Sequence, residues 1–195
     1  TASSPRWPDF FRVTAADAYA VSPGWGWTDT GYRYSGDMGG PDTLCRDFVR
    51  PLPCCPTSDP MQFRLDLPNG SYTVYLIARS GELHGMPVLP WQIAAEGVVR
   101  VDVPMDSATF LSTDYYYRGM DEDYPLTTSF FEKFEQANYP AYAFNVTVSD
   151  GSLDVSISHA WVYMLVVYPT ALEGEMGPRL AGWEADRRAQ FESTY

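Results

Sequence analysis

The sequence predicts a mainly β protein, an antiparallel jelly-roll β-sandwich with one or two short helices. Two segments carry turn residues between runs of alternating apolar and polar side chains, which is the period of half-buried strands. A third segment, Trp161–Tyr168, is almost continuously apolar and has the length of a buried strand. The chain has 195 residues, of which 45% are hydrophobic. This length and composition fit one folded domain with a substantial core.

The first alternating segment is Phe63–Leu67, in which apolar residues alternate with charged ones. The turn residues Pro68, Asn69 and Gly70 follow it, and Asn and Gly tolerate positive φ. The next run, Tyr72–Ala78, is rich in β-branched and aromatic residues, which favour strands. We therefore expect the two runs to pair antiparallel as a hairpin.

The second alternating segment places Asp150 and Gly151 between the runs Phe144–Val148 and Leu153–Ile157. Asp-Gly between two such runs is a strong hairpin signal. We expect these runs to pair antiparallel as well, with Gly151 at positive φ.

The remaining strands are expected around these two segments. The run Trp161–Tyr168 is expected to be a central strand that is covered on both faces. Gln92–Ala95 and Val98–Val103 resemble strands, and Phe110–Thr113 is a further candidate. Residues 1–60 are rich in Gly, Pro and aromatic residues, and we expect loops with short strands there.

Two helices are predicted in the second half of the chain. Thr127, Thr128 and Ser129 are suited to cap a short helix from Phe130 to Ala137. The second helix is expected over Pro178–Glu192, after a turn at residues 173–177.

These elements predict two parts of the chain: a β-sandwich domain over residues 1–172 and a C-terminal connector helix over residues 173–195. The connector would lead to a further domain downstream. The alternative is a helix that docks on its own sandwich.

The formal net charge is −12, with 13 Lys plus Arg against 25 Asp plus Glu. Nucleic-acid binding needs clustered cations to neutralise phosphates, and the sequence has no basic run. The charge also disfavours anionic membranes, and no stretch is long and apolar enough to span a bilayer. We therefore expect neither nucleic acid nor a membrane as a partner.

The three cysteines are Cys45, Cys54 and Cys55. A disulfide from Cys45 to either of the others would close a loop of about ten residues and contribute roughly 2–3 kcal/mol. The alternative is reduced, buried thiols. The pairing therefore stays open.

Catalytic and cofactor-binding motifs are absent from the sequence, and His84 and His159 lie far apart in it. The acidic run Asp121, Glu122 and Asp123 is interpreted first as a solvated face. Its alternative is a structural calcium site, for which residues 36–42 are a second source of oxygen ligands. No other cofactor is expected.

Aromatic clusters are the strongest functional candidates, because aromatic rings cover the flat C–H faces of sugars while a few polar groups orient the hydroxyls. Burial of the rings in the core is the competing interpretation, most of all for the two tryptophans. The predicted ligand-binding residues are Trp25, Trp27, Tyr32, Asp114, Tyr115, Tyr116, Tyr117 and Arg118.

Several of these segments together resemble a known domain family. They are YAVSPGWGWTD from Tyr19, RDF from Arg46, FRLDLPNGSYTVYLIA from Phe63 and FNVTVSDGSLDVSIS from Phe144. The chain resembles malectin-like and other galactose-binding-like β-sandwich domains, which accompany bacterial carbohydrate-active enzymes. The match covers most of the chain, but the long segment after residue 114 and the cysteine cluster depart from it. No sugar-contacting residue is carried over from the family.

The resemblance implies a non-catalytic carbohydrate-binding or substrate-positioning module of a secreted polysaccharide-degrading enzyme. The expected partner is a carbohydrate, more readily a neutral one given the charge, with a catalytic domain downstream in the same polypeptide. The expected location is secreted or periplasmic. The alternatives are a structural or protein-interaction sandwich without sugar affinity and a small glycan hydrolase or lyase.

Overall fold

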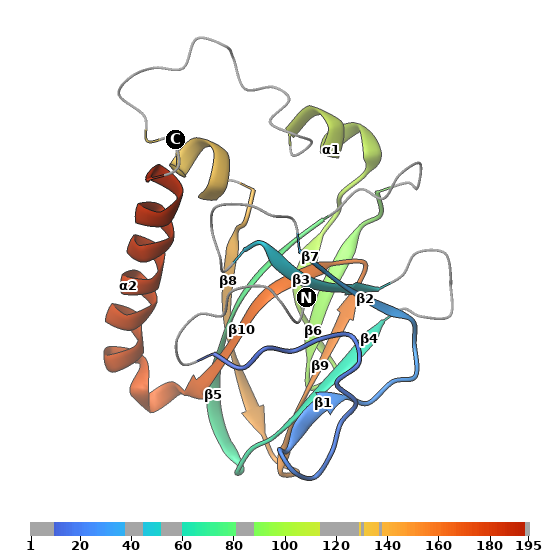
Figure 1. Cartoon of the computed structure of the whole chain (residues 1–195). Coiled ribbons are helices and arrows are strands. Elements are labelled where there is room, and N and C mark those ends of the chain that lie inside the picture. Colours follow the sequence, from blue (N-terminus) through green and yellow to red (C-terminus); the bar gives the residue numbers. More distant parts are fainter. Residues whose placement is uncertain are drawn as a thin grey trace.

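The computed structural model of the chain is a sandwich of two five-stranded antiparallel sheets (Figure 1). This confirms the predicted mainly β class. The structure describes residues 10–37, 45–51, 60–80, 88–113, 129, 131–136 and 138–193.

The strands divide between the sheets in a non-sequential order. In spatial order, the first sheet holds β1 (Trp25–Trp27), β4 (Met61–Asp66), β9 (Ser152–Ser158), β6 (Trp91–Ala95) and β7 (Val98–Val103). The second sheet holds β2 (Arg33–Asp37), β3 (Asp47–Pro51), β10 (Trp161–Pro169), β5 (Gly70–Arg79) and β8 (Ala141–Val148). The first three strands are short, as expected for the loop-rich N-terminal part.

Both predicted hairpins are wrong, although their strands are present. β4 and β5 lie in different sheets, and so do β8 and β9. Instead, β4 pairs with β9 and β5 pairs with β8, all antiparallel. The turn residues fix where the chain reverses, but they do not fix which sheet receives the next strand. This pairing of distant strands is the jelly-roll pattern.

The two reversals lie side by side, and Asn69 joins them. Its side-chain amide donates to the carbonyl of Ser149 at 2.9 Å, and its side-chain oxygen accepts from the backbone N–H of Gly151 at 2.9 Å. The N–H of Leu67 donates to the carbonyl of Gly151 at 3.0 Å. The two connections therefore cross between the sheets as one hydrogen-bonded unit.

The core lies between the sheets, where the apolar face of each strand is buried. Its fully buried members come from both sheets and include Met61, Val74, Leu76, Trp91, Ile93, Leu153 and Val155. β10 is the central strand of the second sheet, as predicted. Val162 and Leu165 pack on the core, whereas Met164 and Val166 pack with Trp183 on the other face of the sheet.

The helices differ in part from expectation. Residues 110–113, predicted as a strand, end the helix α1 (Ser107–Thr113). The cause is the residue before the helix: the carboxylate of Asp106 accepts from the N–H of Thr109 at 2.7 Å, as an N-cap does. This hydrogen bond lowers the pKa of Asp106. The helix predicted near Phe130 is present as a π-helical turn, η3 (Phe131–Gln136), and its predicted first caps lie outside the described residues.

The C-terminal helix α2 (Glu173–Glu192) begins five residues earlier than predicted and directly follows a 3₁₀ turn, η4 (Thr170–Leu172). The residues expected to form a turn are helical because their first member is anchored to the sheet. The carboxylate of Glu173 accepts from the hydroxyl of Tyr168 at 2.9 Å, and the hydroxyl oxygen of Thr73 lies 3.2 Å from the same carboxylate.

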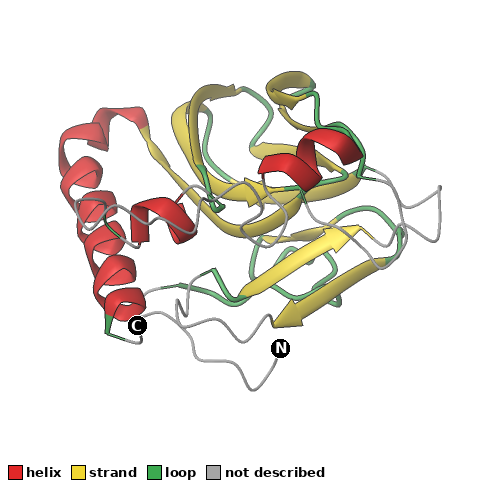
Figure 2. Ribbon diagram, turned by 90° about the horizontal axis from the view of Figure 1, so that it is seen from above, coloured by secondary structure: helices red, strands yellow, loops and turns green. Residues whose placement is uncertain are grey.

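Helix α2 packs on the second sheet and on η3. Both helical segments lie at one side of the sandwich (Figure 2). Its buried residues are Arg187 and Phe191, and the Phe191 ring meets the Phe131 ring edge to face at 6.0 Å. The helix therefore docks on its own sandwich. Its role as a connector to a further domain stays a prediction.

Gly151 has the predicted positive φ, at +88°, and no atom lies within 4 Å of where a Cβ would stand. Gly151→Val should lower the free energy of unfolding by about 1–2 kcal/mol, because a β-branched side chain resists this conformation. Gly151→Asn is the matched control and should cost much less, since Asn tolerates positive φ. Urea denaturation measures both. Equal stability of the valine variant and the parent protein would contradict the assignment.

Candidate functional site

Trp27, a predicted ligand-binding residue, is a core residue. Only 5% of it is exposed, and its ring meets that of Phe63 edge to face at 4.9 Å. Its indole N–H donates to the carbonyl of Thr14 at 2.8 Å. The ring is therefore not available for stacking on a ligand, and the prediction for this residue is corrected to a structural role.

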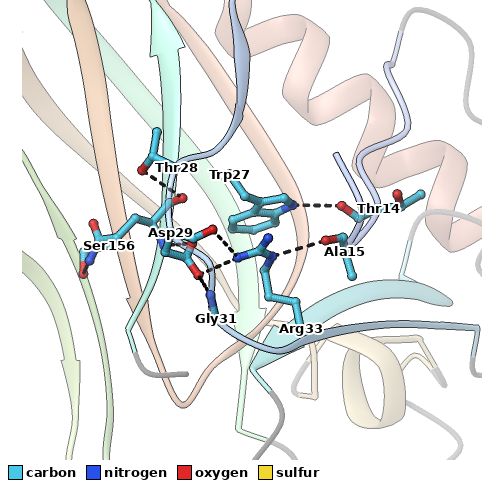
Figure 3. Close-up of polar contacts among 9 residues, drawn as sticks. Thr14, Ala15, Trp27, Thr28, Asp29, Gly31, Arg33 and Ser156 are labelled. Carbon is cyan, nitrogen blue, oxygen red and sulfur yellow. Dashed lines mark hydrogen bonds and ion pairs between the residues drawn. The ribbon is translucent and has the colours of Figure 1, made fainter. Parts of the chain in front are cut away.

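A cluster of polar contacts around Trp27 holds the loop that leads into β2 (Figure 3). The Arg33 guanidinium lies over the Trp27 ring, 5.1 Å from its centroid, and forms an ion pair with Asp29. Asp29 also accepts from the N–H of Gly31 at 2.9 Å and from the N–H of Gln62 at 2.8 Å. We call these contacts the Asp29 clamp.

The Asp29 clamp fixes the position of β2. The exposed fractions of the two charged side chains are 8% for Arg33 and 16% for Asp29, so the pair is largely shielded from water. The guanidinium also donates to the carbonyl of Ala15 at 3.3 Å, which ties the N-terminal segment to the same strand. Because side chains alternate along a strand, fixing Arg33 on one side places Tyr34 on the other.

Tyr34 belongs to a stack of side chains on the outer face of the second sheet. The Arg50 guanidinium lies between two rings, 5.0 Å from the centroid of Tyr34 and 5.1 Å from that of Trp161. These residues come from β2, β3 and β10, which are neighbours in the sheet. Arg50 is 7% exposed, whereas Tyr34 is 46% exposed and Trp161 is half-buried. The cation is thus shielded while the outer ring faces solvent.

Phe48 supports this stack. Its ring lies parallel to that of Trp161, with centroids 4.3 Å apart and an interplanar angle of 18°. It also reaches under Tyr34, at 6.0 Å. Gly36 makes room for it, because a Cβ there would overlap both the Phe48 ring and the Tyr34 ring. We name Tyr34, Phe48, Arg50 and Trp161 the aromatic–arginine surface.

The same packing continues toward α2. The Tyr163 ring contacts Phe48 at 5.9 Å and Tyr139 edge to face at 4.9 Å, and the Arg79 guanidinium lies 5.2 Å from the Tyr139 centroid. Burial raises the pKa of Tyr163 well above its usual value, so its phenol stays neutral at physiological pH. The alternation of rings and guanidinium groups gives this surface a preformed, rigid base.

The remaining predicted site residues have different outcomes. Trp25 is half-buried, with its ring 6.5 Å from Phe11 and 6.4 Å from Phe63. Tyr32 is 63% exposed and lies just before β2, two residues before Tyr34 in the sequence. The predicted cluster Asp114, Tyr115, Tyr116, Tyr117 and Arg118 lies outside the described residues.

Sequence reasoning missed Phe48, Arg50 and Trp161 as members of a site. Phe48 and Arg50 are two residues apart in a short run, which is the spacing of one face of a strand. That spacing alone could have marked a surface pair. Their meeting with Trp161 depends on β3 lying beside β10, which no local pattern indicates.

The predicted calcium site and the predicted disulfide include Asp37 and Cys45 among the described residues. Among the described residues, no three His, Cys, Asp or Glu side chains gather closely enough to hold a metal ion. The carboxylate of Asp37, a candidate calcium ligand, accepts two hydrogen bonds from Arg46 at 2.8 Å. Cys45 is buried, and its two candidate disulfide partners lie outside the described residues. Calcium and a disulfide both stay predictions.

His159 stands at the connection between β9 and β10 with φ of 55°, and its Nδ1 lies 3.2 Å from the carbonyl oxygen of Pro90. No helix in the described part of the chain has the length and apolar character needed to cross a membrane.

Comparisons with known proteins find likeness in structure alone. No family model matches the sequence, and no curated protein matches it significantly. Among solved structures, the chain resembles the protein YXIM of Bacillus subtilis, with a TM-score of 0.53 and 20% identity, over 85% of this chain and 37% of that one. This chain thus spans well under half of that protein.

Two further structures are more distant. A Bacteroides uniformis β-glucuronidase gives a TM-score of 0.40 and 12% identity, over 74% of this chain and 14% of that one. A CBM35 from Paenibacillus barcinonensis gives a TM-score of 0.35 and 10% identity, over 78% of this chain and 98% of that one. At these identities the likeness concerns the fold alone. Of the three structures, the Bacillus subtilis protein alone has a TM-score above 0.5, so it carries the comparison of folds.

The Asp29 clamp can be tested against an exposed ion pair of the same protein. Asp29→Ala should lower the free energy of unfolding by roughly 3 kcal/mol, because it leaves Arg33 shielded without its counter-ion. Asp154→Ala is the control. Asp154 pairs with Arg64 at 2.7 Å, but the two side chains are 41% and 38% exposed, so the loss should be about 1 kcal/mol or less. Urea unfolding measures the free energy of unfolding of both variants. An equal loss of stability in the two variants would contradict the special role of the Asp29 clamp.

Proposed function

We propose that this domain binds carbohydrate through the aromatic–arginine surface. The observation that carries the proposal is the exposed Tyr34 ring, held in place by Arg50 and Phe48 beneath it. A rigid aromatic ring at the surface covers the C–H face of a sugar with little loss of conformational entropy on binding.

The polar groups that such a site needs are close to the ring. Tyr34 and Tyr32 are both exposed, and a phenol hydroxyl can donate one hydrogen bond and also accept. They would orient sugar hydroxyls while the ring supplies apolar contact. Arg50 has a positioning role in this scheme, because its guanidinium fixes the planes of the two flanking rings.

The ligand we propose is a neutral glycan. The chain carries a net charge of −12, and this field repels a polyanion such as a sulfated or uronate-rich polymer. A neutral ligand loses nothing to that repulsion. Its binding should therefore change little with salt, since no long-range attraction is screened.

The biological setting that we propose follows the sequence resemblance. The domain would be a non-catalytic, malectin-like module of a secreted polysaccharide-degrading enzyme, and it would hold the substrate near a catalytic domain in the same polypeptide. A secreted or periplasmic location would also favour a disulfide from Cys45, because those compartments are oxidising.

A glycan array with the purified chain identifies the ligand, and calorimetric titration with the best neutral oligosaccharide measures its affinity. Tyr34→Ala should weaken binding at least tenfold, because the stacking ring is lost, and should leave the melting temperature almost unchanged. Tyr34→Phe keeps the ring and should lose much less.

Two outcomes would overturn the proposal. One is unchanged affinity in Tyr34→Ala. The other is that no neutral or anionic glycan binds the intact chain at millimolar concentration, which would favour a structural or protein-interaction module.

The predicted Tyr115–Tyr117 cluster can be tested in the same titration. Alanine substitution of Tyr115, Tyr116 and Tyr117 should reduce glycan affinity with little change in melting temperature, if these rings extend the sugar-binding surface. A variant that binds normally, or that unfolds, would remove the cluster from the site. Leu172→Ala, at an exposed position on η4, serves as the control.

A further inference from the structure

Each sheet has two edge strands, and an unprotected edge is a template for pairing with another strand. The first sheet ends at β1, whose Trp25 and Trp27 are bridged by Ala20 and Ala18 of the N-terminal segment. The second sheet ends at β2, which the same segment approaches: Arg33 donates to the carbonyl of Ala15 at 3.3 Å. The N-terminal segment thus bridges the β1 edge, and it contacts β2, which also carries the charged residues Arg33 and Asp37.

The opposite edge of the first sheet is β7, and it carries two protective features. A bulge interrupts its pairing with β6 between Ile93 and Ala94, which bends the edge. The strand also carries Arg100 and Asp102, both exposed. Charged residues and bulges are the usual means by which proteins keep edge strands from pairing.

The opposite edge of the second sheet, β8, has neither feature. Its eight residues, AYAFNVTV, include no charged residue and no proline. Its pairing with β5 runs without a bulge from Gly70↔Val148 to Ile77↔Ala141. In the part of the chain that the structure describes, no strand pairs with its other edge. β8 is therefore a long, regular and uncharged edge strand. The other edge strands are bridged by the N-terminal segment, interrupted by a bulge or marked by charged side chains.

We propose that β8 pairs antiparallel with β8 of a second copy of this chain, with the two-fold axis at Asn145, so that two five-stranded sheets become one continuous sheet. The sequence of the strand is self-complementary in this register. Phe144 would lie opposite the partner's Val146, and Tyr142 opposite the partner's Val148, all on the core face.

The other face of β8 fits the same register. Ala143 would lie opposite the partner's Thr147, and the two Asn145 side chains would meet at the axis, where amides can hydrogen-bond to each other. Ala141, Ala143 and Asn145 are exposed, so helix α2 does not cover this face of the strand. Tyr142 and Phe144 are only half-buried in one chain, and pairing would complete their burial.

Charge sets the conditions under which the dimer forms. Two chains of net charge −12 repel each other at long range, but the seam itself holds no charge. Salt screens the long-range repulsion between the two chains and leaves the backbone hydrogen bonds between the paired strands intact. Dimerisation should therefore become stronger as salt increases, which is the opposite of an interface held by ion pairs.

Sedimentation equilibrium of the whole chain tests the proposal through the molar mass. At submillimolar concentration in moderate salt, the parent chain should approach twice the 21.9 kDa of one copy. Asn145→Asp keeps the oxygen that accepts from Thr73 Oγ1 at 3.0 Å, but it sets two like charges face to face at the axis. It should weaken dimerisation at least tenfold.

Ser71→Asp is the matched control, because it adds the same charge to an exposed position one strand away from the seam, on β5. It should dimerise as the parent does. A parent chain that stays monomeric at every concentration and salt would overturn the proposal, as would equal dimerisation of the Asn145→Asp variant. Neither result depends on glycan binding, so the proposed function stands or fails separately.

Discussion

The structure depends on the paired crossing of two chain reversals between the sheets. Asn69 in one reversal makes hydrogen bonds to Ser149 and Gly151 in the other, and Leu67 adds a third contact. Because both connections cross together, β4 and β9 become neighbours in one sheet while β5 and β8 become neighbours in the other. The residues paired in these two strand pairs lie 64 to 96 positions apart in the sequence, so this crossing sets the topology to which the remaining strands add.

The aromatic–arginine surface and the edge position of β8 both follow from that topology. In the second sheet, β5 pairs with β8 on one side and β10 on the other, and β10 then meets β3 and β2. The first relation leaves β8 at an edge. The second brings Arg50 of β3 between Tyr34 of β2 and Trp161 of β10. The Asp29 clamp on the inner side holds β2 so that Tyr34 keeps its place in the stack.

Local sequence patterns predicted the strands well and their partners badly. Alternation located β4, β5, β8 and β9, and Asp-Gly correctly predicted the backbone of Gly151. Pairing failed because a turn specifies a reversal, while burial of both apolar faces in one shared core decides which sheet each strand enters. In the candidate site, Tyr32 was chosen by its residue type and is exposed, and its contact with a ligand stays a prediction. Trp27 was predicted to bind ligand but is buried. Its ring packs against Phe63 of β4 and under the guanidinium of Arg33 of β2, and no local sequence pattern indicates these contacts.

Nuclear magnetic resonance can test, residue by residue, whether sugar binds at the aromatic–arginine surface. The backbone amide signals and the tryptophan indole N–H signals of the ¹⁵N-labelled chain are followed while the best neutral oligosaccharide from the array is added. We expect the shifts to centre on Tyr32, Tyr34, Arg50 and the indole N–H of Trp161, and the signals of β7 and β8 to stay unchanged. Shifts centred on another face of the sandwich, with these four residues unaffected, would contradict it.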